Sequence, residues 1–100
     1  IKVNVDFLPN IKIGFDLYNS PNGGIAYARI YKNGTPIGTE RSQSVAAWQT
    51  YEQNLGPFVK GDLIQLYVRQ NVGYQAAVRN FRLYYSENLW QEADFTNQDP

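Results

Sequence analysis

The chain has 100 residues, of which 43% are hydrophobic and 15% aromatic, and its nine basic and nine acidic side chains give a formal net charge of zero. Such a chain is long enough for one small domain with a single core and too apolar to be disordered. No segment approaches the roughly 20 apolar residues of a membrane-spanning helix, so we expect no membrane insertion. Because histidine and cysteine are absent, catalysis by imidazole or thiolate, disulfide bonds and most zinc sites are excluded.

The charges are distributed unevenly along the chain. Residues 1–85 carry nine basic and five acidic side chains, a net charge of +4, whereas the last fifteen residues carry −4 from Glu87, Glu92, Asp94 and Asp99. We interpret 1–86 as a folded domain and 87–100 as an acidic tail or linker. A charge of +4 spread over several strands falls short of the clustered basic face typical of nucleic-acid binding, so we expect no nucleic-acid partner. The absence of methionine predicts a domain excised from a longer gene product.

Two strand-like segments open the chain, each with apolar residues at every second position. The first contains Ile1, Val3, Val5 and Phe7, and the second contains Ile11, Ile13, Phe15 and Leu17. Alternation of this kind buries one face of a strand and exposes the other. Asp6 and Asp16 then fall on the exposed face, where they would be neighbours if the two strands pair.

A hairpin is predicted near the middle of the chain. Residues 25–32 (IAYARIYK) carry small and apolar side chains at both odd and even positions, which predicts a strand covered on both sides or lying at a subunit contact. Asn33-Gly34 follows, and both residues accept the positive φ of a type I′ turn. The return strand is predicted over 35–41. Pro36 makes it an edge strand or places a bulge at its start, because proline cannot donate to a ladder.

The segment 44–55 is the one stretch where a helix is arguable. It lacks an apolar stripe at helical spacing, and its Trp48, Thr50 and Tyr51 favour extended structure. We therefore predict a strand that ends at Gly56-Pro57.

The clearest strand follows at 63–70. Its inward positions are Ile64, Leu66 and Val68. Residues 77–85 alternate again, and their core side consists of Phe81, Leu83 and Tyr85. About seven or eight strands, with turns every eight to twelve residues, predict an all-β fold, namely an antiparallel, jelly-roll-like β-sandwich.

A candidate binding surface depends on how strands 63–70 and 77–85 are arranged. If they pair as a hairpin, their outer face presents together Gln65, Tyr67, Arg69, Asn80, Arg82 and Tyr84. We add Trp48, because tryptophan and tyrosine combine a flat apolar ring with a hydrogen-bonding group, which suits both sugar rings and protein interfaces. The same face could instead be solvated, or be covered by an edge of the second sheet or by the acidic tail.

The remaining residues include few that would suit catalysis or cofactor binding. Glycoside hydrolysis needs two carboxylates about 5 to 9 Å apart; Asp6 and Asp16 are a candidate pair, although a solvated strand face explains them more simply. Calcium binding needs a cluster of carboxylates, and the loop 19–24 offers none. We expect neither an enzyme nor a cofactor.

Three segments together resemble a known class of modules. They are ARIYKNGTPIGTER (28–41), FVKGDLIQLYVRQ (58–70) and VRNFRLYY (78–85). In this order they resemble the β-sandwich domains of bacteriophage tail and tail-fibre proteins and, more remotely, the trimeric heads of the complement-type and tumour necrosis factor-like group. The resemblance implies a non-enzymatic module of a virion or extracellular surface. It also implies contact with protein subunits, including further copies of the chain, or with a cell-surface glycan.

A second interpretation is a carbohydrate-binding module attached to an enzyme. A solvent-exposed, roughly coplanar strip containing Trp48 or Trp90 favours this interpretation, and burial of both tryptophans counts against it. The sequence leaves the choice between the two interpretations open.

Overall fold

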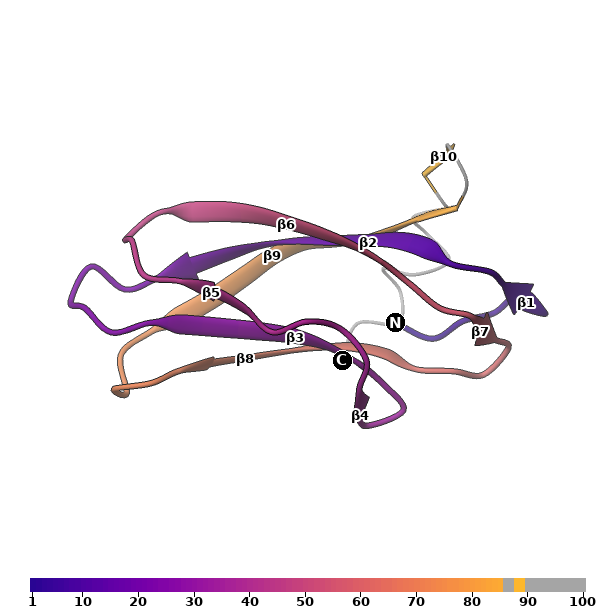
Figure 1. The fold of residues 1–100 in the computed structure, drawn as a ribbon, viewed down its shortest axis with the longest axis horizontal. Coiled ribbons are helices and arrows are strands. Elements are labelled where there is room, and N and C mark those ends of the chain that lie inside the picture. The colour runs from indigo at the N-terminus through magenta and orange to yellow at the C-terminus, as the bar shows by residue number, and fades with distance from the viewer. Residues whose placement is uncertain (86–87, 90–100) are drawn as a thin grey trace.

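The computed structural model describes residues 1–85 and 88–89, and all of its regular structure is β (Figure 1). The strands are β1 (Phe7–Leu8), β2 (Ile11–Asn19), β3 (Ala26–Lys32), β4 (Thr35–Pro36), β5 (Arg41–Gln43), β6 (Trp48–Leu55), β7 (Phe58–Val59), β8 (Ile64–Gln70), β9 (Ala76–Tyr85) and β10 (Asn88–Leu89). Each pairing between them is antiparallel. The all-β, antiparallel prediction is confirmed. The described residues include no helix that could cross a membrane.

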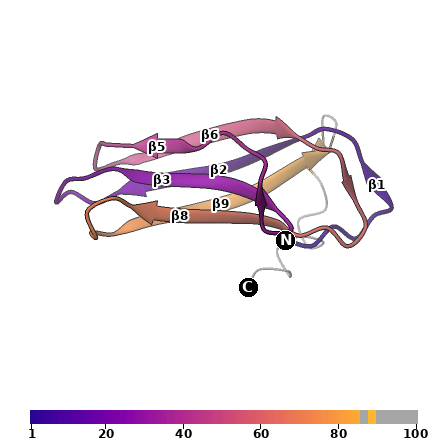
Figure 2. The same ribbon diagram turned by 60° about the horizontal axis from the view of Figure 1, so that its bottom comes forward.

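Two sheets lie face to face and form a sandwich (Figures 1 and 2). In one sheet β2 is central, with β6 on one side and β9 on the other, and β10 pairs with the end of β9. In the other sheet β3 is central, with β8 along one side and the short strands β4 and β5 along the other. A separate small sheet of β1 and β7 lies at one end of the molecule. β3 and β6 are strands where the sequence predicted them.

The core lies between the two sheets and takes its side chains from the inward positions of the central strands. These include Ile13 and Leu17 of β2, Ile30 of β3, Ile64 of β8 and Leu83 of β9, all at most 2% exposed. Burying one such side chain stabilises the fold by about 1.5–3 kcal/mol. The inward positions predicted for β2 and for the start of β8 are confirmed by this burial. The opposite face of β2 is not exposed as predicted, because Gly14 and Asp16 are buried as well.

The N-terminal segment departs from its prediction. Residues 1–8 do not form one strand, because Ile1 bonds to Ile64 at the start of β8 and Val3 bonds to the turn before it. The N–H of Val3 donates to the carbonyl of Asp62 over 2.8 Å. The chain then bends, so that Phe7 is 58% exposed while Leu8 is buried. β1 pairs with β7 and not with β2, so the segments that carry Asp6 and Asp16 do not pair. The condition under which these two carboxylates would be neighbours is therefore not met.

The Asn33-Gly34 turn is confirmed by its backbone, with φ of 53° at Asn33 and 83° at Gly34. The return strand is shorter than predicted, since β4 ends at Pro36 and pairing with β3 resumes in β5 only after four intervening residues. After Pro36 the N–H groups of Ile37 and Gly38 both donate to the carbonyl of Ile30, which interrupts the ladder. β4 lies at the edge of its sheet, as Pro36 predicted.

β9 contains a bulge that the sequence pattern did not reveal. Arg79 pairs with Asp16, but Arg82 pairs with Gly14, so two residues of β9 oppose one of β2. Asn80 adopts a φ of 57° at this point. The extra residue reverses the parity of the strand, so that Leu83 faces the core beyond the bulge as predicted. The inward side chain predicted for Tyr85, and the tail predicted over 87–100 apart from the backbone of β10, lie outside the described residues.

Candidate functional site

The outer face of β3 and β8 presents alternating tyrosine and arginine side chains. The register places Tyr27 opposite Arg69, Arg29 opposite Tyr67, and Tyr31 opposite Gln65. Successive side chains of a strand point to opposite faces, and Ala28 and Ile30 are buried in the core, so their odd-numbered neighbours point outward. We call this set the tyrosine–arginine face: Tyr27, Arg29, Tyr31, Gln65, Tyr67 and Arg69.

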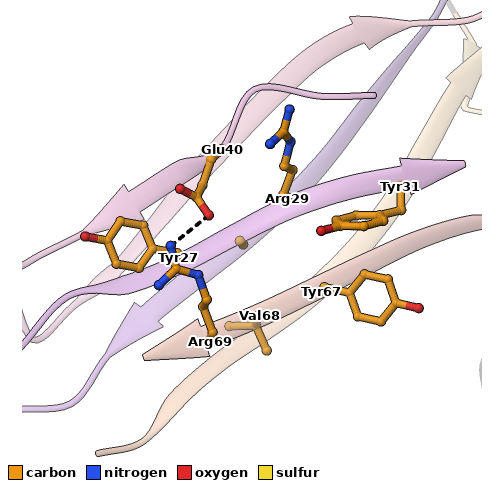
Figure 3. A pocket seen from close by; sticks show the side chains of 8 residues that line it. Tyr27, Arg29, Tyr31, Glu40, Tyr67, Val68 and Arg69 are labelled. Carbon is orange, nitrogen blue, oxygen red and sulfur yellow. Dashed lines mark hydrogen bonds and ion pairs between the residues drawn. The ribbon is translucent and has the colours of Figure 1, made fainter. Parts of the chain in front are cut away.

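Ring and charge contacts hold this face in place (Figure 3). The guanidinium of Arg69 lies 4.1 Å from the ring centroid of Tyr27 and 3.2 Å from the carboxylate of Glu40. The rings of Tyr31 and Tyr67 meet edge to face, with centroids 4.6 Å apart. Such cation–π and edge-to-face contacts contribute about 0.5–1.5 kcal/mol each. The side chains are therefore oriented before any partner arrives.

A shallow hollow of about 70 Å³ opens among these side chains. Glu40 lies on one side of it, and Arg29 is turned to the same side, where its Nε donates to the carbonyl of Gly38 over 2.6 Å. The hollow is far smaller than the roughly 300–1,000 Å³ of an ordinary ligand pocket. It has room for one side chain or one ring substituent, which suits surface contact rather than enclosure of a substrate.

The opposite face of the sandwich, on β9, β2 and β6, is organised around the carboxylate of Asp16. Asp16 was predicted to be exposed, but it is only 7% exposed, because it lies on the central strand beneath longer side chains from both neighbours. It accepts hydrogen bonds from the hydroxyl of Thr50 (2.8 Å), the amide of Asn80 (2.8 Å) and Nε of Arg79 (3.1 Å). Arg82 lies 3.8 Å away. We call these residues the Asp16 network.

The Asp16 network keeps this carboxylate ionised. Burial raises the pKa of Asp16, but the three hydrogen bonds and the positive charge of Arg82 lower it by more, so the pKa lies below its ordinary value of 3.8. A general acid needs a raised pKa and a free oxygen. Asp16 has neither property, so its chemistry is that of a structural anchor.

Trp48 lies at the edge of the same face and is 38% exposed. Its ring lies 5.2 Å from that of Tyr18, tilted by 41°, and the guanidinium of Arg79 lies 3.9 Å over it. The rings are not coplanar, and one side of the indole is occupied by Arg79. Trp90 lies outside the described residues.

The structure separates the residues of the predicted binding surface. β8 pairs with β3 and β9 pairs with β2, so the loop 71–75 carries the chain from one sheet to the other. The hairpin on which the predicted surface depends does not form. Gln65, Tyr67 and Arg69 face outward on one side of the sandwich. The remaining predicted residues, which lie on the other sheet, are Trp48, Asn80, Arg82 and Tyr84.

Sequence reasoning missed the β3 half of the tyrosine–arginine face. Tyr27, Arg29 and Tyr31 share one parity in AYARIYK, and that alternation was a usable signal. Arg79 was missed because uninterrupted alternation along this strand would have placed it on the core side, and the bulge at Asn80 places it on the outer side instead. Glu40 could not be found, since it lies in the irregular segment between β4 and β5.

The described residues contain no group of three acidic side chains positioned to hold a metal ion. Fold and site together define an all-β, sandwich-like module with an outward tyrosine–arginine face. Comparison of the chain with family models, curated proteins and solved structures finds no match.

Proposed function

We propose that this chain is a non-catalytic structural or adhesive module of a phage tail or a similar virion or extracellular surface assembly. It works by protein–protein or protein–glycan contact through the tyrosine–arginine face. The observation that carries the proposal is the hollow among Tyr27, Tyr31, Tyr67 and Arg69, whose rings and charge are oriented by one another. Tyrosines held on rigid strands lose little conformational entropy on binding, which favours contact with a partner.

The experiment measures retention of the labelled domain on two immobilised probes: bacterial surface polysaccharides, and the domain itself. We expect retention on at least one probe. The double variant Tyr27→Ser/Tyr31→Ser should lose retention on the polysaccharide, while Trp48→Ser/Tyr84→Ser on the other face should keep it. Absence of retention on both probes, or turnover of a polysaccharide by the domain, contradicts the proposal.

A carbohydrate-binding module attached to an enzyme is the second candidate, favoured by the exposed part of Trp48 beside Tyr18. Arg79 over the indole weighs against it, because a bound sugar ring would have to displace that cation. The same experiment separates the two candidates: polysaccharide retention that is lost in Trp48→Ser/Tyr84→Ser and kept in Tyr27→Ser/Tyr31→Ser assigns the function to the Trp48 face.

A further inference from the structure

In the part of the chain that the structure describes, no strand lies along the outer edge of β8. Among the described residues, β8 pairs only with β3, and its seven residues follow β3 without a register shift. The sequence IQLYVRQ contains no proline, glycine or lysine. Natural sheets protect their edges with proline, with lysine and other charged side chains, or with bulges. β8 carries one charged side chain, Arg69, and none of the other devices.

The other sheet edges are protected. β4 carries Pro36, and β9 carries the bulge at Asn80 together with two arginines. β6 is tied to the segment 39–43, since the hydroxyl of Tyr51 donates to the carbonyl of Ser42 and the amide of Gln53 to the hydroxyl of Thr39. β8 is therefore the least protected of these sheet edges.

The hydrogen bonds at the start of β8 show which of its backbone groups point to this edge. The N–H of Ile64 donates to the carbonyl of Ile1 over 2.7 Å, and the N-terminus donates to the carbonyl of Ile64 over 2.8 Å. The groups of Ile64 therefore point away from β3. On the β3 side the carbonyl of Ile30, opposite Leu66, accepts from Ile37 and so also points away from β8.

Alternate residues of a strand direct their backbone groups to the same side. The N–H and C=O of Leu66, Val68 and Gln70 consequently point to the open edge, and those of Ile64 are already bonded to Ile1. A further strand can pair with the second half of β8 but not with its first residue.

We propose that this edge pairs with β8 of a second copy of the chain, antiparallel and about a two-fold axis at Val68. This inference rests on the proposed function as a contact module and names its partner. In that register Val68 lies opposite Val68 of the partner subunit, and Leu66 lies opposite Gln70 of the partner subunit. These are the residues whose backbone groups point outward, so the pairing uses the open groups and leaves the bonds of Ile64 to Ile1 intact.

The side chains are self-complementary in this register. Tyr67 lies opposite Arg69 of the partner subunit, so no charge faces a like charge. Within one chain Tyr67 already faces Arg29 across β3, and Arg69 faces Tyr27 with a cation–π contact of 4.1 Å. Pairing of two copies continues the same alternation of tyrosine and arginine over a sheet that spans both subunits. It also covers Tyr67 and Val68, which are 51% and 38% exposed.

The absence of cysteine from the chain allows a direct test. Val68→Cys places one thiol at the two-fold axis, where the Cα atoms of such a pair lie about 5.5 Å apart, within the range of a disulfide. The matched control is Val45→Cys in the β5–β6 turn, which is 62% exposed and would oxidise faster if accessibility alone decided. Under mild oxidation we expect Val68→Cys to form a covalent dimer and Val45→Cys to stay monomeric.

A second pair of variants tests the contact without a covalent crosslink. Light scattering and sedimentation of the full chain should show a mass that rises with concentration towards that of a dimer. Val68→Lys sets like charges opposite each other and should abolish this rise, whereas Val45→Lys should leave it unchanged. A dimer that persists in Val68→Lys, or equal crosslinking of the two cysteine variants, overturns the pairing. A monomer at every concentration that is still retained on polysaccharide overturns the pairing and leaves the proposed function standing.

Discussion

At the scale of single residues, the same chemical group takes different roles according to its position on a strand. Asp6 and Asp16 occupy matching places in two similar sequence segments, yet Asp6 is exposed in a bend and Asp16 lies buried on a central strand. A buried carboxylate is stable only when hydrogen bonds and charge replace its water. The Asp16 network supplies both, and in doing so it fixes Arg79 and Arg82.

Asp16→Asn is expected to lower the free energy of unfolding by about 2 kcal/mol, because an amide cannot accept all of the donors that surround this position. Urea unfolding of the variant and of Asp6→Asn measures the difference. The control should change by less than about 0.5 kcal/mol, as exposed substitutions usually do. Equal losses in the two variants would mean that Asp16 is not the anchor of this face.

At the scale of elements, the bulge in β9 decides which residues share a face. Without it Val78 and Leu83 would point to opposite sides, whereas both now pack on the core side against Leu17 and Ile13 of β2. Asn80 tolerates the positive φ, and its side chain also bonds to Asp16. One residue therefore joins backbone geometry to the Asp16 network.

Two substitutions at Asn80 separate these contributions. Asn80→Gly keeps the positive φ and removes the hydrogen bond, so it should cost about 1 kcal/mol. Asn80→Ala removes the bond and adds roughly 1–2 kcal/mol of strain from a left-handed backbone. Urea midpoints of both variants provide the measurement. An alanine variant as stable as the glycine variant would refute the role assigned to the backbone.

At the scale of the whole molecule, acid stability depends on the two carboxylates that are buried among the described residues, Asp16 and Asp62. The N–H of Val59 and the amide of Asn33 donate to Asp62 and, with the charge of Lys32, lower its pKa against the effect of burial. The pKa of Asp16 is lowered as well. Between these lowered pKa values and the unfolded value near 4, the unfolded chain binds more protons than the folded one, so stability rises with pH there.

We therefore expect the free energy of unfolding to be nearly constant from pH 7 to about pH 5 and to fall as the pH drops below about 4. The chain has no histidine to titrate between these values. Urea unfolding at a series of pH values tests this, with Asp16→Asn/Asp62→Asn as the control that should flatten the acid limb. A steep loss near pH 6, or an unchanged acid limb in the double variant, contradicts it.

The sequence by itself determined the all-β class, the strands β2, β3, β6 and β8, the Asn33-Gly34 turn and the outward parity of Tyr67 and Arg69. These features depend on alternation and turn chemistry, which act between residues close in the chain. It also placed Pro36 on an edge strand, because a missing donor is a local property.

Only the tertiary structure decided which strands are neighbours. Adjacent segments with equal alternation can pair with each other or cross to opposite sheets, and the loop 71–75 allows either outcome. The choice followed from β2 and β3 each taking the centre of a sheet, where their mostly apolar inner faces are buried most completely. That choice divided the predicted surface between two faces and buried Asp16. It also left the edge of β8 open, because pairing and burial depend on contacts between residues far apart in the chain.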